Sequence, residues 1–220
     1  RSVGYSAVEL IKLDQIWEER EQRIEFVYEP RARELAEKRT PTQYMTAHVG
    51  PWQVAPMLVR PFDVTINTIY APESNPVMNE LMQELRGAIG EKLISSEDGP
   101  RPIMRELKAG NSVVMAIDTR PRQGKLIPFF GRDALTNTSA VGLALRTGAA
   151  VMLGRGERLP GGHYRLTIYD PIESPIPDAP VKEQSAAMTE VIHGHFEQWI
   201  RETPEQWLCL KRRWPKEHKL

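Results

Sequence analysis

Residues 43–54 read Gln-Tyr-Met-Thr-Ala-His-Val-Gly-Pro-Trp-Gln-Val, and this stretch indicates a strand with a polar group mounted at its end. The segment 43–47 predicts a strand that delivers His48 to the edge of a sheet. Gly50 permits a sharp turn, and Pro51 suits the first turn of a following helix. His48 is therefore placed where a general base would be mounted. The alternative is a buried histidine that only packs at the strand end.

A second strand is predicted at 112–117, because the run Val113-Val114-Met115-Ala116 is continuously apolar. Such a run is typical of parallel sheets that are covered on both faces. The patterns predict further strands at 24–28, 64–70, 149–155 and 164–169, and helices over 5–21, 31–38, 51–60, 75–88, 102–108, 135–147 and 182–202. This alternation predicts an α/β fold, with a central mixed, mostly parallel sheet that is flanked by helices and ends in an antiparallel pair. We expect one domain over residues 1–220.

The charge balance bears on the class of partner. Lys plus Arg and Asp plus Glu both number 29, so the formal net charge is zero, which argues against a general nucleic-acid binder. Local basic clusters, such as Arg120 with Arg122 and Lys125, suit an anionic, phosphate-bearing substrate or an acidic partner, although a solvated face explains them equally. The single cysteine, Cys209, excludes an internal disulfide. No apolar run approaches the roughly 18 residues that span a bilayer.

Two patterns on the predicted helices receive structural interpretations. Met78, Leu81, Met82 and Leu85 share one face of helix 75–88, and we expect this face to be core and not a binding surface. His193 and His195 lie two positions apart on helix 182–202, so they face different sides and make a poor metal pair. We predict no metal site.

Five segments, in order, carry a resemblance to a known family. They are His48 to Gln53; Ile69-Tyr70 through Asn75-Pro76; Gly110 through Asp118 with Gly124 and Pro128-Phe129-Phe130-Gly131; Arg158 to Gly162 followed by Tyr164-Arg165-Leu166; and Pro204 to Leu208 with Arg212-Arg213-Trp214. Together they resemble the late acyltransferases of lipid A biosynthesis, the lauroyl/myristoyl transferases of Gram-negative bacteria. The resemblance covers most of the chain and implies a glycerolipid-acyltransferase-like sandwich.

The resemblance also implies a reaction. A fatty acyl chain would pass from acyl carrier protein to a hydroxyl of a lipid A precursor, an anionic glycolipid, without a metal or organic cofactor. His48 would be the base, Gln53 would stand where the family has an acid that orients the ring, and Asp118 would support the site. The residues implied in substrate binding are Trp52, Tyr70, Asn75, Arg120, Phe129, Phe130 and Gly131, with the two phenylalanines walling an apolar groove.

Several positions depart from the family pattern. Gln53 can accept a ring N–H but carries no charge to stabilise an imidazolium. Pro51, Ala71 and Thr119 replace the family's Asn, Arg and Gln. A second hypothesis follows from these departures: an impaired or inactive acyltransferase-like scaffold, diverged or engineered, that binds lipid or a partner without turnover.

The resemblance implies work at the cytoplasmic face of the bacterial inner membrane. Family members usually carry an N-terminal membrane helix ahead of the segment present here, so we expect this chain to be soluble or to attach peripherally. The candidate surface combines two tryptophans with basic residues: Trp207, Trp214, Lys211, Arg212, Arg213 and Lys216. The alternative for the tryptophans is aromatic packing against the C-terminal helix.

Overall fold

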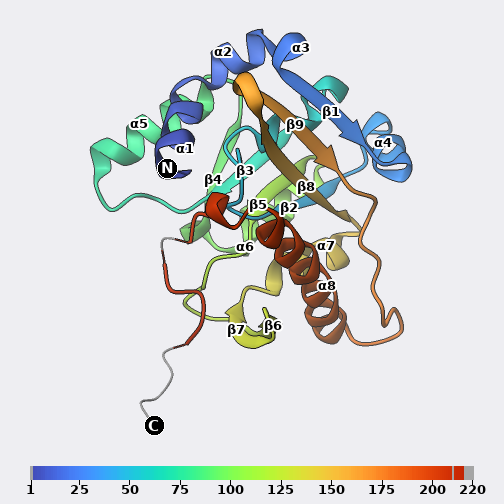
Figure 1. Ribbon diagram of the computed structural model, residues 1–220. Helices are drawn as coiled ribbons and strands as arrows, with labels where there is room; N and C mark the ends of the chain where they lie inside the picture. The colour runs from blue at the N-terminus through green and yellow to red at the C-terminus, as the bar shows by residue number, and fades with distance from the viewer. Residues whose placement is uncertain (1, 210, 216–220) are drawn as a thin grey trace.

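The computed structural model describes residues 2–209 and 211–215, and within them seven strands form one central sheet (Figure 1). In chain order these strands are β1 (Ile24–Tyr28), β2 (Thr42–Thr46), β3 (Ile66–Tyr70), β4 (Lys92–Ser95), β5 (Ser112–Ala116), β8 (Ala150–Leu159) and β9 (His163–Ile168). Their order across the sheet is β1-β9-β8-β2-β5-β3-β4, and every neighbouring pair is parallel except β8 and β9. The predicted α/β fold with a mixed, mostly parallel sheet is confirmed.

The helices cover both faces of this sheet (Figure 1). They are α1 (Ser2–Ile11), α2 (Leu13–Glu18), α3 (Arg20–Arg23), α4 (Pro30–Glu37), α5 (Pro76–Gly87), α6 (Pro100–Lys108), α7 (Ser139–Thr147) and α8 (Val181–Glu202), with 3₁₀ turns η1 (Ala55–Phe62), η2 (Ser96–Asp98), η3 (Pro160–Gly162) and η4 (Pro204–Gln206). Tyr44 of β2 belongs to the core shared with α1, α2 and η1, whereas its neighbour Met45 belongs to the core shared with α7 and α8. Side chains alternate along a strand, so a strand covered on both faces is apolar throughout.

Two details of the predicted sheet need correction. The antiparallel pair does not end the sheet, because β1 pairs in parallel with β9 and forms the edge itself. The strand β4 has no counterpart among the predicted elements. Its four residues alternate too briefly to give a period, and it is paired only with β3.

Three predicted helices also differ. The single helix expected over 5–21 is divided into α1, α2 and α3. The helix expected over 51–60 is instead a turn followed by η1, where Pro56 and Pro61 remove N–H donors that an α-helix needs. The first residues of the helix expected over 135–147 belong to a separate hairpin, β6 (Lys125–Phe129) with β7 (Arg132–Thr136). Its two loop residues, Phe130 and Gly131, both have positive φ, as the type I′ hairpin turn requires.

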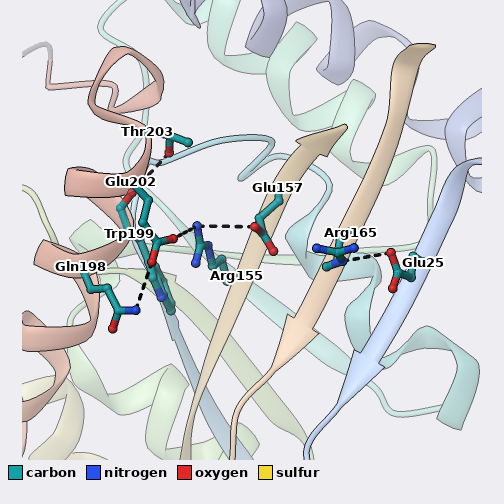
Figure 2. A network of polar contacts seen from close by, with 8 residues as sticks. All are labelled: Glu25, Arg155, Glu157, Arg165, Gln198, Trp199, Glu202 and Thr203. Atoms are coloured by element: carbon teal, nitrogen blue, oxygen red, sulfur yellow. Dashed lines mark hydrogen bonds and ion pairs between the residues drawn. The ribbon is translucent and has the colours of Figure 1, made fainter. Parts of the chain in front are cut away.

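Ion pairs connect β9 to β1 and β8 to α8 (Figure 2). Arg165 of β9 contacts Glu25 of β1 at 2.9 Å. Arg155 of β8 lies between Glu157, at 3.5 Å, and Glu202 of α8, at 2.6 Å. These contacts attach the C-terminal end of α8 to the sheet, just before the segment that reaches the candidate site.

The apolar face of α5 departs from its predicted role as core. Met82 and Leu85 pack against the core at the C-terminal half of the helix, as expected. Met78 and Leu81 are 45% and 44% exposed, however, and Val77 beside them is 72% exposed. The stripe of apolar residues therefore extends beyond the core, and its N-terminal half lies on the surface.

Candidate active site

His48 and Asp118 come together because their strands are parallel neighbours. Thr46, the last residue of β2, pairs with Ala116, the last residue of β5, and the Ile117 amide donates to the Thr46 carbonyl at 3.2 Å. His48 and Asp118 each lie two residues beyond those strand ends. Parallel strands place their carboxyl ends at one edge of the sheet, which is where ligand sites form in α/β folds. The register thus sets the two side chains opposite each other.

Their side chains make a short contact. His48 Nδ1 lies 2.6 Å from Asp118 Oδ1, and the carboxylate is almost completely buried while the imidazole is 22% exposed. Burial alone would raise the pKa of the Asp118 carboxyl, but the charge of His48 and the hydrogen bonds from His48 and Trp207 outweigh it and hold that pKa below its ordinary value. An ionised Asp118 accepts the Nδ1 proton, so Nε2 of the neutral ring carries a lone pair.

The turn after His48 depends on two glycines. Gly50 has φ +62°, a left-handed conformation that side-chain-bearing residues seldom adopt, and a Cβ added there would lie 2.5 Å from the carbonyl oxygen of Gly156. A Cβ added at Gly156 would lie 2.9 Å from Pro51 Cγ. The loop therefore packs directly against the backbone of β8, and Pro51 serves this contact and not the start of an α-helix.

The segment after α8 closes the site from the other end of the chain. Trp207 Nε1 donates to Asp118 Oδ2 at 2.9 Å, so each carboxylate oxygen accepts one hydrogen bond. The Leu208 amide donates to the His48 carbonyl at 2.7 Å, and the Gly50 amide donates to the Gln206 carbonyl at 3.3 Å. The residues following α8 are thus paired with the backbone on both sides of Val49.

Arg158 of β8 connects this pairing to α1. Its guanidinium contacts the carboxylate of Glu9 through two nitrogens, at 2.6 and 2.8 Å, and both side chains are nearly buried. It also donates to the Gly50 carbonyl at 2.9 Å and to Gln206 Oε1 at 3.2 Å. One cation therefore holds together α1, the loop after His48 and the segment after α8.

The other residues of the histidine box do not replace Asp118. Gln53 is buried, and among the described residues the ring nitrogen Nδ1 of His48 is bonded to Asp118 and not to Gln53. The ring contact predicted for Gln53 is thus made by Asp118, and the catalytic roles of both residues stay predictions. The Trp52 ring meets the His48 ring edge to face, with centroids 4.7 Å apart, and its Nε1 is buried without a hydrogen-bond partner. Trp52 fixes one side of the imidazole.

The predicted binding residues on other elements are spread around this edge. Tyr70 is the last residue of β3 and is half-buried. Asn75 caps α5, because its Oδ1 accepts from the amides of Val77 and Met78, which gives the Asn-Pro pair a structural role. Arg120 is exposed two residues after Asp118. Substrate binding by these residues stays a prediction.

The two phenylalanines that were predicted to wall a groove are in edge-to-face contact, with ring centroids 4.9 Å apart, but they differ in exposure. Phe129 is fully buried and packs against Trp207, Trp214 and His193, so it cannot contact a substrate in this conformation. Phe130 is half-buried, and its amide donates to Glu197 at 2.7 Å. Gly131 is exposed at the tip of the hairpin.

The predicted membrane surface at the C-terminus also requires correction. Arg213 is buried and donates to the Leu135 carbonyl and to Thr136 Oγ1, each at 2.6 Å. Trp214 Nε1 donates to the Phe129 carbonyl at 3.0 Å. These residues hold the C-terminal segment against the β6–β7 hairpin, as in the packing alternative for the tryptophans. Lys216 lies outside the described residues.

His193, on the buried side of α8, has a structural environment. Its Nδ1 lies 2.8 Å from the Pro128 carbonyl, and its Nε2 lies 3.3 Å from the Arg213 guanidinium. Burial lowers the pKa of His193 to about 4, so the ring is neutral, donates from Nδ1 and accepts at Nε2. Within residues 2–209 and 211–215 no group of three or more His, Cys, Asp or Glu is placed to hold a metal ion.

Sequence reasoning missed two residues of the site, Trp207 and Arg158. Both stand in segments that carried the family resemblance, so recurrence in a motif was the available signal. Neither residue type, by itself, points to the contacts made here, which join Trp207 to Asp118 and Arg158 to the Gly50 carbonyl. Figure 1 shows why: the segment after α8 returns to the carboxyl ends of the central strands.

Comparison with known proteins adds an independent line of evidence. The family model described as bacterial lipid A biosynthesis acyltransferase matches residues 1–216. Among solved structures, the chain is similar to the 1-acyl-sn-glycerophosphate (LPA) acyltransferase PlsC from Thermotoga maritima, with 15% identity over 90% of this chain and 83% of that chain, and a TM-score of 0.49. A comparison with curated proteins found no match. The family match spans nearly the whole chain, and the chain therefore belongs to the bacterial lipid A biosynthesis acyltransferase family.

Proposed function

We propose that this chain transfers a fatty acyl group from the thioester of acyl carrier protein to a hydroxyl of a lipid A precursor. The observation that carries the proposal is the 2.6 Å contact between His48 and a buried, ionised Asp118. This pair supplies the charge that Gln53 lacks. It favours catalysis over the inactive-scaffold hypothesis, because a carboxylate at Nδ1 leaves Nε2 to accept a proton and stabilises the imidazolium that forms.

The geometry supports a direct transfer. His48 Nε2 takes the proton from the acceptor hydroxyl as its oxygen attacks the thioester carbonyl carbon. The tetrahedral intermediate then collapses, the carbon–sulfur bond breaks, and the imidazolium returns its proton to the departing thiolate. Asp118 holds the Nδ1 proton throughout and stabilises the positive ring, so the products are the ester and the free thiol of the carrier.

The test is acyl transfer by the purified chain, with a His48→Ala variant as the control. Acyl carrier protein thioester and the lipid A precursor should give an acylated product that the variant does not form. Replacing the donor by acyl-coenzyme A, or the acceptor by a lysophospholipid, tests each half of the proposal separately. Equal product from the unmodified chain and His48→Ala would contradict catalysis and return the inactive scaffold to first place.

We further propose that the chain contacts the lipid surface through α1 and α5, and not through its C-terminal tryptophans. Figure 1 shows these helices side by side. Their exposed apolar side chains, here called the α1–α5 surface, are Val3, Tyr5, Val8, Ile11, Val77, Met78 and Leu81. One face of α1 is buried against the protein, and the opposite, exposed face carries apolar side chains as well. A helix with apolar residues on its exposed face typically binds a second apolar surface there. Among the described residues, no helix could itself cross a bilayer.

The position of this surface suits a lipid acceptor. The N-terminal half of α5 follows the carboxyl end of β3, the sheet edge that carries His48. Replacing Val8, Ile11 and Leu81 together by Ser should reduce sedimentation with anionic phospholipid vesicles. Leu126→Ser is the matched control, because Leu126 is 56% exposed on the β6–β7 hairpin. Equal sedimentation of both variants would contradict contact through the α1–α5 surface. Such contact would suit an enzyme that acts at the cytoplasmic face of the inner membrane.

A further inference from the structure

The candidate base is oriented by a carboxylate whose second oxygen has its own donor. Trp207 Nε1 lies 2.9 Å from Asp118 Oδ2, while Oδ1 faces His48 Nδ1. Asp118 is almost completely buried, so no solvent donor competes for that oxygen. An indole nitrogen can only donate. The carboxylate therefore has one orientation in which both contacts are made.

Trp207 is itself fixed from several sides. Its backbone pairs with that of Val49 as an isolated bridge, and the next amide, that of Leu208, donates to the His48 carbonyl. Its ring contacts Phe129 and Phe130, with centroids 6.0 and 6.4 Å apart. The indole N–H is thus held at Asp118 by backbone pairing with residues 48 and 49 and by aromatic contacts of its ring.

We infer that Trp207 is a positioning residue of the acyl transfer, which acts through Asp118 to hold the His48 ring in its productive tautomer and orientation. The inference rests on the proposed function for its kinetic part only. Without the indole N–H, Oδ2 is left unpaired and the carboxylate is free to turn. The Nδ1 proton of His48 then loses an acceptor of fixed orientation, and the ring is no longer held with Nε2 free to act as the base.

The chain offers a matched control for this test. Trp214 lies in the same aromatic cluster, with its ring centroid 6.2 Å from that of Trp207, and its Nε1 donates to a backbone carbonyl and not to Asp118. Trp207→Phe and Trp214→Phe therefore make the same chemical change among the same neighbours. Only the first removes a donor from the carboxylate.

The experiment measures the tautomer of His48, from the nitrogen NMR signals of its two ring nitrogens in histidine-labelled protein, together with the rate of acyl transfer. With Trp207→Phe we expect the two ring-nitrogen signals of His48 to move away from those of a single neutral tautomer protonated at Nδ1, because the carboxylate that selects this tautomer is no longer fixed. The limiting rate should fall about tenfold with the donor KM unchanged, a typical cost of losing an orienting partner. Trp214→Phe should leave both unchanged.

Two outcomes decide the inference. His48 ring-nitrogen signals in Trp207→Phe that coincide with those in Trp214→Phe would overturn it, whatever the activity. Changed His48 ring-nitrogen signals in a chain that transfers no acyl group would support the positioning role while the proposed function fails. If Trp207→Phe does not fold, replacing Trp207 by benzothienylalanine keeps the ring shape and removes only the N–H, and the same change in the ring-nitrogen signals is expected.

Discussion

Replacing Asp118 by Asn tests the site most directly, because the two donors around this residue leave an amide no satisfactory orientation. If the Asn oxygen faces His48 Nδ1, its NH₂ group meets the Trp207 N–H, and two donors oppose each other in a buried site. If the amide turns over, its NH₂ faces Nδ1, so the ring must carry its proton on Nε2 and cannot act as a base. The present contacts, at 2.6 and 2.9 Å, cannot both be kept.

The expected loss of rate is large. In the first orientation the site loses the negative charge that stabilises the imidazolium. In the second, Nε2 of His48 carries the proton and cannot accept another one. The corresponding change in a serine protease lowers the rate by about 10⁴, or roughly 5 kcal/mol of transition-state stabilisation. Leaving one buried group unpaired costs a further 1–3 kcal/mol of folding free energy, by the order of magnitude typical of such groups.

The assay is initial-rate acyl transfer at saturating donor, with thermal unfolding of the same samples. Asp170→Asn is the control, since Asp170 Oδ1 accepts from the amides of Arg31 and Ala32, and an Asn oxygen can do the same. We expect Asp118→Asn to lose at least a hundredfold in rate and Asp170→Asn to lose almost none. A folded Asp118→Asn variant with a rate within fivefold of the unmodified chain would refute the assignment of Asp118 as the orienting acid.

Three further predictions concern the box and two buried titrating groups. Gln53→Ala should lower the rate less than tenfold, and Gln53→Glu should not raise it by orders of magnitude, because Asp118 already orients His48; the same acyl-transfer assay decides. His193 has a folded pKa of about 4, below its unfolded value, so its contribution to stability is present above pH 6.5 and is lost as the pH falls from 6.5 to 4, at about 1.4 kcal/mol per unit. Denaturant titrations should show that His193→Gln flattens this slope, and an unchanged slope would contradict the neutral ring. Burial raises the pKa of Glu91 to about 7, so its contribution is present below pH 4.5 and is lost as the pH rises to 7. Glu91→Gln should raise the unfolding temperature at pH 8 but not at pH 4.5, and equal shifts at both would show another cause.

The sequence predicts the strands of the sheet centre well because each carries its own periodic or continuously apolar pattern. Their order is a different matter. The position of β2 between β5 and β8 depends on which face of the sheet each connecting helix covers. No local sequence pattern predicts it. Asp118 could thus be identified as a site residue at a strand end, but its contact with His48 requires the register of Thr46 with Ala116.

The β6–β7 hairpin was missed for a related reason. Its turn uses Phe130 at φ +54°, where an aromatic residue is strained, and the usual Asn-Gly signal is absent. Arg213 was misjudged because a cation near a chain terminus normally faces water. Here the Leu135 carbonyl and the Thr136 hydroxyl of the hairpin accept from it, and only the tertiary structure brings them there.

The dependence of Asp118 on Trp207 has a consequence for how the protein is made. The two residues are separated by 89 positions, so a ribosome synthesises the histidine, the aspartate and the whole central sheet before the indole exists. During that interval the sheet can assemble, but Asp118 has a buried oxygen without its donor and His48 lacks the backbone partner that Leu208 provides. A nascent chain would therefore form its central sheet before the contacts around His48 and Asp118 are complete. Synthesis of residues 203–208 would be the step that completes the candidate site.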